Sequence, residues 1–198
     1  MTWVLDLAKC YEPPPTERLA GVFGVILYTR GHPHIKKALE DTDYWAALDE
    51  LSGPRWPIFA TVMASGRQAN LPGSSGLSAM MPVWEEPEAN RELLELFEIS
   101  DSKKLPLLVV FAMISDDEVL RTVAPLSDTD QLAAFKSLKE VVITVADAID
   151  NLMKDDQDIS ETEVLAGVSS RLRKLGYFRQ MRSAYRLAKE VKRWMSIV

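Results

Sequence analysis

The chain has 198 residues, of which 47% are hydrophobic and 26% charged, and its formal net charge is −6. This composition is that of an ordinary globular protein whose apolar residues suffice for a core, so neither disulfides nor metal ions are needed for stability. Its one cysteine, Cys10, cannot form an intramolecular disulfide, which excludes a two-cysteine thiol–disulfide oxidoreductase and fits a reducing compartment.

The N-terminus has no basic stretch followed by an apolar stretch, so we expect no secretory signal. No apolar run approaches the roughly 20 residues that a membrane-spanning helix needs. The sequence therefore predicts a cytoplasmic protein without a transmembrane segment.

The charge is divided unevenly along the chain. Residues 161–198 contain nine basic and three acidic residues, which gives this segment +6 and leaves −12 on residues 1–160. Such asymmetry indicates a contact with an acidic partner, nucleic acid or an anionic membrane, or else packing of the basic tail on the acidic body. Both interpretations stay open at this point.

The first half of the chain predicts two strands around a helical stretch. Residues 1–21 form an arm that contains three consecutive prolines and ends any regular element. Residues 22–29 and 56–63 are apolar runs typical of buried strands. Between them, apolar residues at helical spacing predict a helix that breaks near residues 41–43.

Residues 64–89 predict a long insertion rich in Gly, Ser and Pro. The insertion contains three large apolar residues, Met80, Met81 and Trp84. These side chains either pack back onto the body or form an adaptable contact surface for a partner.

The second half predicts a short helix at 90–99, strands at 105–114 and 118–124 joined as a hairpin, and a long helix to Met153. Ser160 and Glu163 form a capping box at the start of a helix that ends before Gly176. A second basic, amphipathic helix is expected at about 177–195, so residues 159–198 predict a basic helical hairpin.

The order β-α-β-α-β-β-α over about residues 22–153 resembles the thioredoxin-like fold, a mixed four-stranded sheet flanked by helices. Residues 25–38 (VILYTRGHPHIKKA) resemble the strand, turn and helix of glutaredoxins. Pro106 stands at the start of the third strand, where the resemblance implies a cis-proline beside the active site. An α/β domain with a helical C-terminal extension is therefore expected.

The resemblance places His32 where the family has its nucleophilic cysteine, Pro33 at the family proline and Ile35 at the second cysteine. Neither histidine nor isoleucine forms a thiolate or a disulfide, so no catalytic residue is predicted. The remaining helix N-terminus has unpaired amide donors that suit an anion or an extended peptide. His32, Pro33, His34 and Pro106 are the candidate ligand-binding residues.

Other kinds of site have less support in the sequence. The chain holds only two histidines and one cysteine, too few for a closed zinc site of the usual ligands, so no metal or cofactor is predicted. Its glycine-rich stretches lack the lysine and the spacing of a phosphate-binding loop. His32 as a general base has no serine or threonine placed by sequence to act as nucleophile.

The basic tail is the strongest functional feature of the sequence. One face of its expected second helix is apolar, and the rest is basic through Arg179, Arg182, Arg186, Lys189 and Arg193. Such an amphipathic helix can bind a partner, pack on the body or pair with its copy in a dimer. We expect a redox-inactive interaction module that binds a protein, or less readily nucleic acid, through this tail or the insertion. The alternative is a glutathione- or anion-binding enzyme similar to glutathione transferases.

Overall fold

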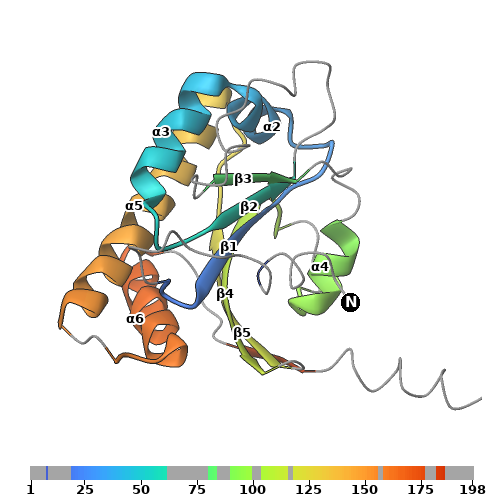
Figure 1. Cartoon of the computed structure of the whole chain (residues 1–198). Helices are drawn as coiled ribbons and strands as arrows, with labels where there is room; N and C mark the ends of the chain where they lie inside the picture. The colour runs from blue at the N-terminus through green and yellow to red at the C-terminus, as the bar shows by residue number, and fades with distance from the viewer. Residues whose placement is uncertain are drawn as a thin grey trace, which may run out of the picture.

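A computed structural model describes Ala8 and residues 19–61, 80–83, 90–99, 104–115, 118–155, 158–176 and 182–185. These residues form one mixed β-sheet flanked by helices (Figure 1). In chain order the elements are β1 (Val22–Leu27), α2 (Pro33–Glu40), α3 (Thr42–Ser52), β2 (Ile58–Thr61), β3 (Met80–Val83), α4 (Asn90–Leu96), β4 (Leu107–Ser115), β5 (Glu118–Pro125), α5 (Gln131–Asp155), α6 (Glu161–Lys174) and β6 (Arg182–Tyr185).

The sheet has six strands in the order β3-β2-β1-β4-β5-β6. β1 pairs with β2 and β2 with β3 in parallel, whereas the β1–β4, β4–β5 and β5–β6 pairs are antiparallel. The four predicted strands are therefore present as the central block β2-β1-β4-β5. The α/β class and the mixed sheet flanked by helices are confirmed, but β3 and β6 extend the sheet beyond the four strands expected.

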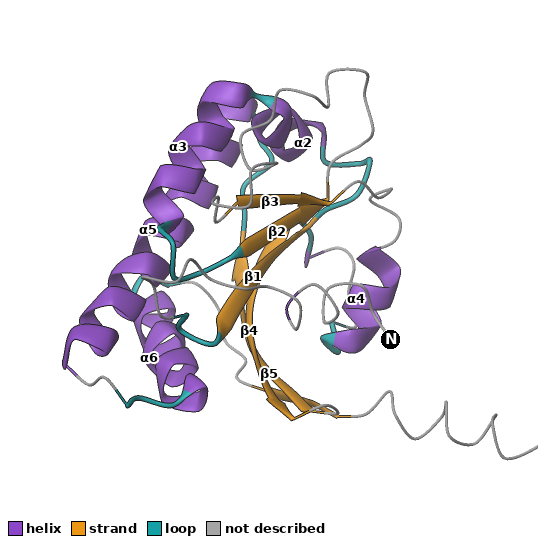
Figure 2. Ribbon diagram, viewed as in Figure 1, coloured by secondary structure: helices purple, strands orange, loops and turns teal. Residues whose placement is uncertain are grey.

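The central strands lie between two layers of side chains. Every residue of β1 is buried, as are the first six of β4, which explains why their sequences are continuous apolar runs. Helices α2, α3, α5 and α6 cover one face of the sheet, and α4 lies on the other (Figures 1 and 2). Two hydrophobic clusters result, one on each face.

The expected break in the first helical stretch falls at Asp41, between α2 and α3. Its carboxylate accepts hydrogen bonds from the backbone N–H groups of Asp43 and Tyr44, both at 3.1 Å. An aspartate in this position satisfies amide donors that a helix start would otherwise leave unpaired. A new helix therefore begins where the preceding one ends.

Helix α6 belongs to the core of the domain. Val164, Leu165, Val168 and Leu172 are each at most 1% exposed and lie in the same cluster as residues of β1 and α5. Gly167 faces α5 so closely that a Cβ there would lie 2.5 Å from Leu152 Cδ1. The helical C-terminal part that the sequence predicts is therefore present as α6, and it packs into the core of the domain.

The prediction of a second helix in the basic hairpin is wrong at residues 182–185. These residues form β6, which pairs with β5 from Arg182 opposite Arg121 to Tyr185 opposite Glu118. The rest of that predicted helix lies outside the described residues. An open strand edge offers backbone hydrogen bonds that can outweigh a helical pattern of apolar residues.

The capping box that the sequence predicts at the start of α6 is confirmed. The Glu163 backbone N–H donates to Ser160 Oγ at 3.4 Å, and Glu163 Oε2 accepts from the Ser160 hydroxyl at 2.7 Å and from its backbone N–H at 3.1 Å. The hydroxyl and then the backbone hydrogen bond of Ser160 lower the pKa of the Glu163 carboxyl.

Because the pKa of Glu163 is lower in the folded chain, its contribution to stability is present above the unfolded pKa and is lost as the pH falls through the folded pKa. We expect Glu163→Ala to lower the melting temperature at pH 7 and to have a smaller effect near pH 3. Thermal unfolding of both proteins at the two pH values measures this difference. An equal loss at both values would show that the ionised carboxylate adds nothing.

Candidate functional site

The turn between β1 and α2 holds the candidate residues that stand where the family resemblance puts cysteines. The His32 backbone N–H donates to the Thr29 carbonyl oxygen at 2.9 Å, which closes the turn. His32 then occupies the N-cap position of α2, and Pro33 lies in the first helical turn, where its missing N–H leaves no donor unsatisfied. His32 and His34 are both half-buried.

The hydrogen bonds of His32 fix which ring nitrogen carries the proton. Its Nδ1 lies 3.1 Å from the Thr29 backbone nitrogen and 3.0 Å from Thr29 Oγ1. A backbone N–H can only donate, so Nδ1 is the acceptor and the neutral ring carries its proton on Nε2. In this form neither nitrogen is available to abstract a proton, which gives the general-base interpretation of His32 no support.

Asp128 occupies the N-terminal end of α2, although it is 93 residues away from Ile35. Asp128 Oδ1 accepts the Ile35 backbone N–H at 2.7 Å, the short distance typical of a charge-assisted hydrogen bond. Pro33 offers no N–H, and that of His32 is bound within the turn. At the helix end that the sequence interpreted as open to an anion, one amide donor, that of Ile35, is thus already bound by a carboxylate of the chain itself.

Sequence reasoning did not assign this role to Asp128. The long helix α5 is opened by Asp130, whose Oδ1 accepts the Ala133 backbone N–H at 2.8 Å. An aspartate before a helix is a local signal only for that helix. No local pattern in the sequence shows that the carboxylate of Asp128 caps the distant helix α2.

Pro106 lies at the same end of the sheet as this turn. The Leu105–Pro106 peptide bond is cis, as the resemblance implied. Leu27, the last residue of β1, pairs with Leu107, the first of β4, so the residues beyond each strand end are neighbours. The Pro106 carbonyl accepts the Leu126 N–H at 2.9 Å, which brings the loop that carries Asp128 to this end as well.

The candidates from the predicted insertion have different outcomes. Met80 is fully buried in β3, and its backbone N–H donates to Asp49 Oδ1 on α3 at 2.8 Å. It is therefore a core residue, and its prediction as a partner contact is wrong. Met81 lies in β3, where only the backbone is described, and Trp84 lies outside the described residues.

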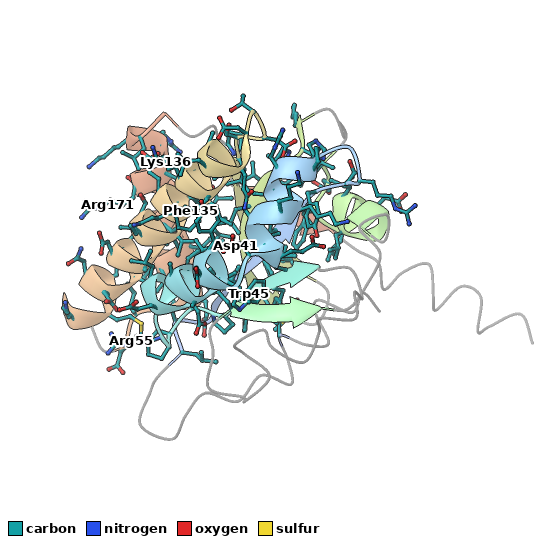
Figure 3. All side chains as sticks on the ribbon, turned by 90° about the horizontal axis from the view of Figure 1, so that it is seen from above. Asp41, Trp45, Arg55, Phe135, Lys136 and Arg171 are labelled. Atoms are coloured by element: carbon teal, nitrogen blue, oxygen red, sulfur yellow. The ribbon has the colours of Figure 1, made fainter. Side chains whose placement is uncertain are left out.

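The last turn of α6 carries Arg171, Arg173 and Lys174, and all three are exposed. In Figure 3, Arg171 lies at the outer side of the helical layer. Within the described part of the chain, none of the three forms an ion pair, although the first 160 residues carry −12. Among the described residues, these three cations therefore do not pair with the acidic side chains of the body.

The predicted partner residues of the tail fall mostly where the structure gives no placement. Arg182 is in β6, with its backbone described, opposite the buried Arg121 of β5. The Arg121 Nη2 donates to the Glu98 carbonyl oxygen at 3.3 Å, just beyond α4. Arg179, Arg186, Lys189 and Arg193, together with Cys10, lie outside the described residues.

Among the described residues, no three His, Cys, Asp or Glu side chains gather as metal ligands would. None of the described helices is both long enough and apolar enough to cross a bilayer. No known protein family, curated protein or solved structure matches this chain.

Proposed function

We propose that this chain is an interaction module: a thioredoxin-like domain without redox chemistry that binds a protein partner through its basic C-terminal segment, residues 161–198. The observation that carries the proposal is the exposure of Arg171, Arg173 and Lys174 without an intramolecular ion pair in the described chain. A cytoplasmic location belongs to the same proposal, because a single cysteine fits a reducing compartment.

Three observations support the thioredoxin-like part of the proposal. The central strands have the expected parallel and antiparallel pairs, α5 closes the fold, and a cis-proline lies at the sheet end that holds the β1–α2 turn. His32 and Ile35 stand where the resemblance puts the two cysteines. A thiolate cannot form there, so the module contributes a surface to its partner.

The alternative, a glutathione- or anion-binding enzyme, gains no support from the start of α2. Asp128 holds one of the amide donors that an anion would use, and its negative charge repels such a ligand. A calorimetric titration of the full chain with glutathione is expected to show no binding. Saturable binding would favour the enzyme over the module.

The proposal is tested by affinity capture from lysate with the full chain. Truncation before α6 would remove part of the core and confuse a loss of folding with a loss of binding. The test therefore uses substitutions. In the test variant the five predicted contact cations become glutamine: Arg179, Arg182, Arg186, Lys189 and Arg193. In the matched control four lysines of α2 and α5 and one lysine just before β4 become glutamine: Lys37, Lys136, Lys139, Lys154 and Lys104.

We expect the control to retain a protein partner that dissociates with rising salt, and the test variant to lose it. Equal melting temperatures of the two variants show that both are folded. Retention of the same partner by the test variant would contradict a contact through these five residues. Recovery of nucleic acid in place of protein would contradict the proposed class of partner.

A further inference from the structure

The last turn of α6 combines charge with an exposed apolar side chain. We name this surface, Arg171, Arg173, Lys174 and Leu175, the α6 terminus. The three cations are exposed, and Leu175 is 49% exposed. Within residues 171–175 only Leu172 is buried, so the whole outer side of this turn faces solvent.

The helix dipole explains only part of this charge. A helix C-terminus carries about half a negative elementary charge and is stabilised by a nearby cation. In the last turns of α2 and α5 a single lysine does this, Lys37 and Lys154 respectively. Three cations exceed what the dipole can balance, and the dipole gives no reason for an exposed leucine.

The spacing of these residues gives the surface a definite face. Arg171, Lys174 and Leu175 are three and four residues apart, so they lie side by side on one face of the helix. Leu175 keeps near-helical backbone angles, φ −82° and ψ 4°, and its N–H donates to the Arg171 carbonyl. A large apolar side chain is thereby flanked by positive charge on a face that no described element covers.

The chemistry of this face distinguishes between classes of partner. Phosphates of a nucleic acid would meet the cations, but leucine offers no ring for a base to stack on and would stay exposed. A protein segment satisfies both features when an apolar residue stands between carboxylates. We infer that the α6 terminus binds an acidic protein segment whose apolar residue packs on Leu175, an inference that rests on the proposed function.

Fluorescence anisotropy with the full chain and a labelled peptide of alternating glutamate and leucine tests the inference. The double variant Arg171→Glu/Lys174→Glu is expected to bind the peptide at least about tenfold more weakly than wild type. Leu175→Ser is expected to weaken binding by about fivefold to tenfold. The control Lys37→Glu/Lys154→Glu reverses the same charge at two other helix ends and is expected to bind within about twofold of wild type.

Several outcomes would overturn the inference. These are no saturable binding of the peptide, equal weakening by the control, no effect of Leu175→Ser, or tighter binding of a single-stranded oligonucleotide of equal charge. A molecular mass that doubles with concentration and returns to that of the monomer in the double variant would assign the surface to a second copy. Each variant is first checked for an unchanged melting temperature, and Arg171→Gln/Lys174→Gln replaces any that unfolds.

The failure of this inference can be told apart from that of the proposed function. If the partner captured from lysate is lost with the five tail substitutions but kept by Arg171→Glu/Lys174→Glu, the module stands and the α6 terminus is not its contact. If neither variant loses the partner, both proposals fail.

Discussion

Leu165→Ala is expected to lower the free energy of unfolding by about 2–5 kcal/mol, the range for a leucine deleted from a packed core. Leu165 is fully buried in α6, within the cluster that includes β1, α3 and α5. The substitution removes three buried carbon atoms and leaves a cavity that the closely packed α5–α6 pair cannot readily fill. Chemical denaturation measures the loss directly.

Leu175→Ala is the matched control on the same segment. Leu175 is 49% exposed, so its truncation is expected to change the free energy of unfolding by less than about 0.5 kcal/mol. A chain that ends at Gln157 loses the four buried apolar residues of α6, Val164, Leu165, Val168 and Leu172, and is expected not to fold cooperatively. If Leu165→Ala were as stable as Leu175→Ala, α6 would be an appendage and its position in the core would be wrong.

Asp128→Ala is expected to lower the free energy of unfolding by about 1–2 kcal/mol, because it removes the side-chain acceptor at the start of a helix. The Ile35 N–H then has no protein acceptor, and its hydrogen exchange becomes faster. Asp128→Asn keeps an oxygen at this place and is expected to recover part of the loss, which separates the hydrogen bond from the charge.

Asp130→Ala provides the comparison for Asp128, since it removes the cap of α5 and leaves α2 untouched. It is expected to affect exchange at Ala133 and not at Ile35. Unchanged exchange of Ile35 in Asp128→Ala would show that the carboxylate does not occupy the end of α2. Asp128 would then no longer argue against the binding of an external anion at the start of α2.

The predictions that succeeded depend on signals within a short stretch of chain. Strands β1 and β4 are buried on both faces and therefore read as continuous apolar runs. The capping box needs only Ser160 and Glu163, three residues apart. The break at Asp41 follows from one side chain that caps the next helix.

The predictions that failed depend on partners far away in the sequence. β3 contains Pro82, which argues against a strand, yet it forms the edge of the sheet next to β2, where a proline is tolerated. β6 lies within a pattern of helical period, but the edge of β5 pairs with it. Asp128 and Ile35 meet only because the ends of β1 and β5 lie at one end of the sheet. The spacing of residues along the sequence predicts none of these contacts.

A protein partner is expected to contact the basic C-terminal segment and to leave the β1–α2 turn free. Hydrogen exchange over the full chain, with and without the captured partner, tests it most directly. We expect slower exchange on binding within residues 171–198 and no change at residues 29–35. Slower exchange at residues 29–35 with an unchanged C-terminal segment would contradict the claim and make His32 and its neighbours the binding site.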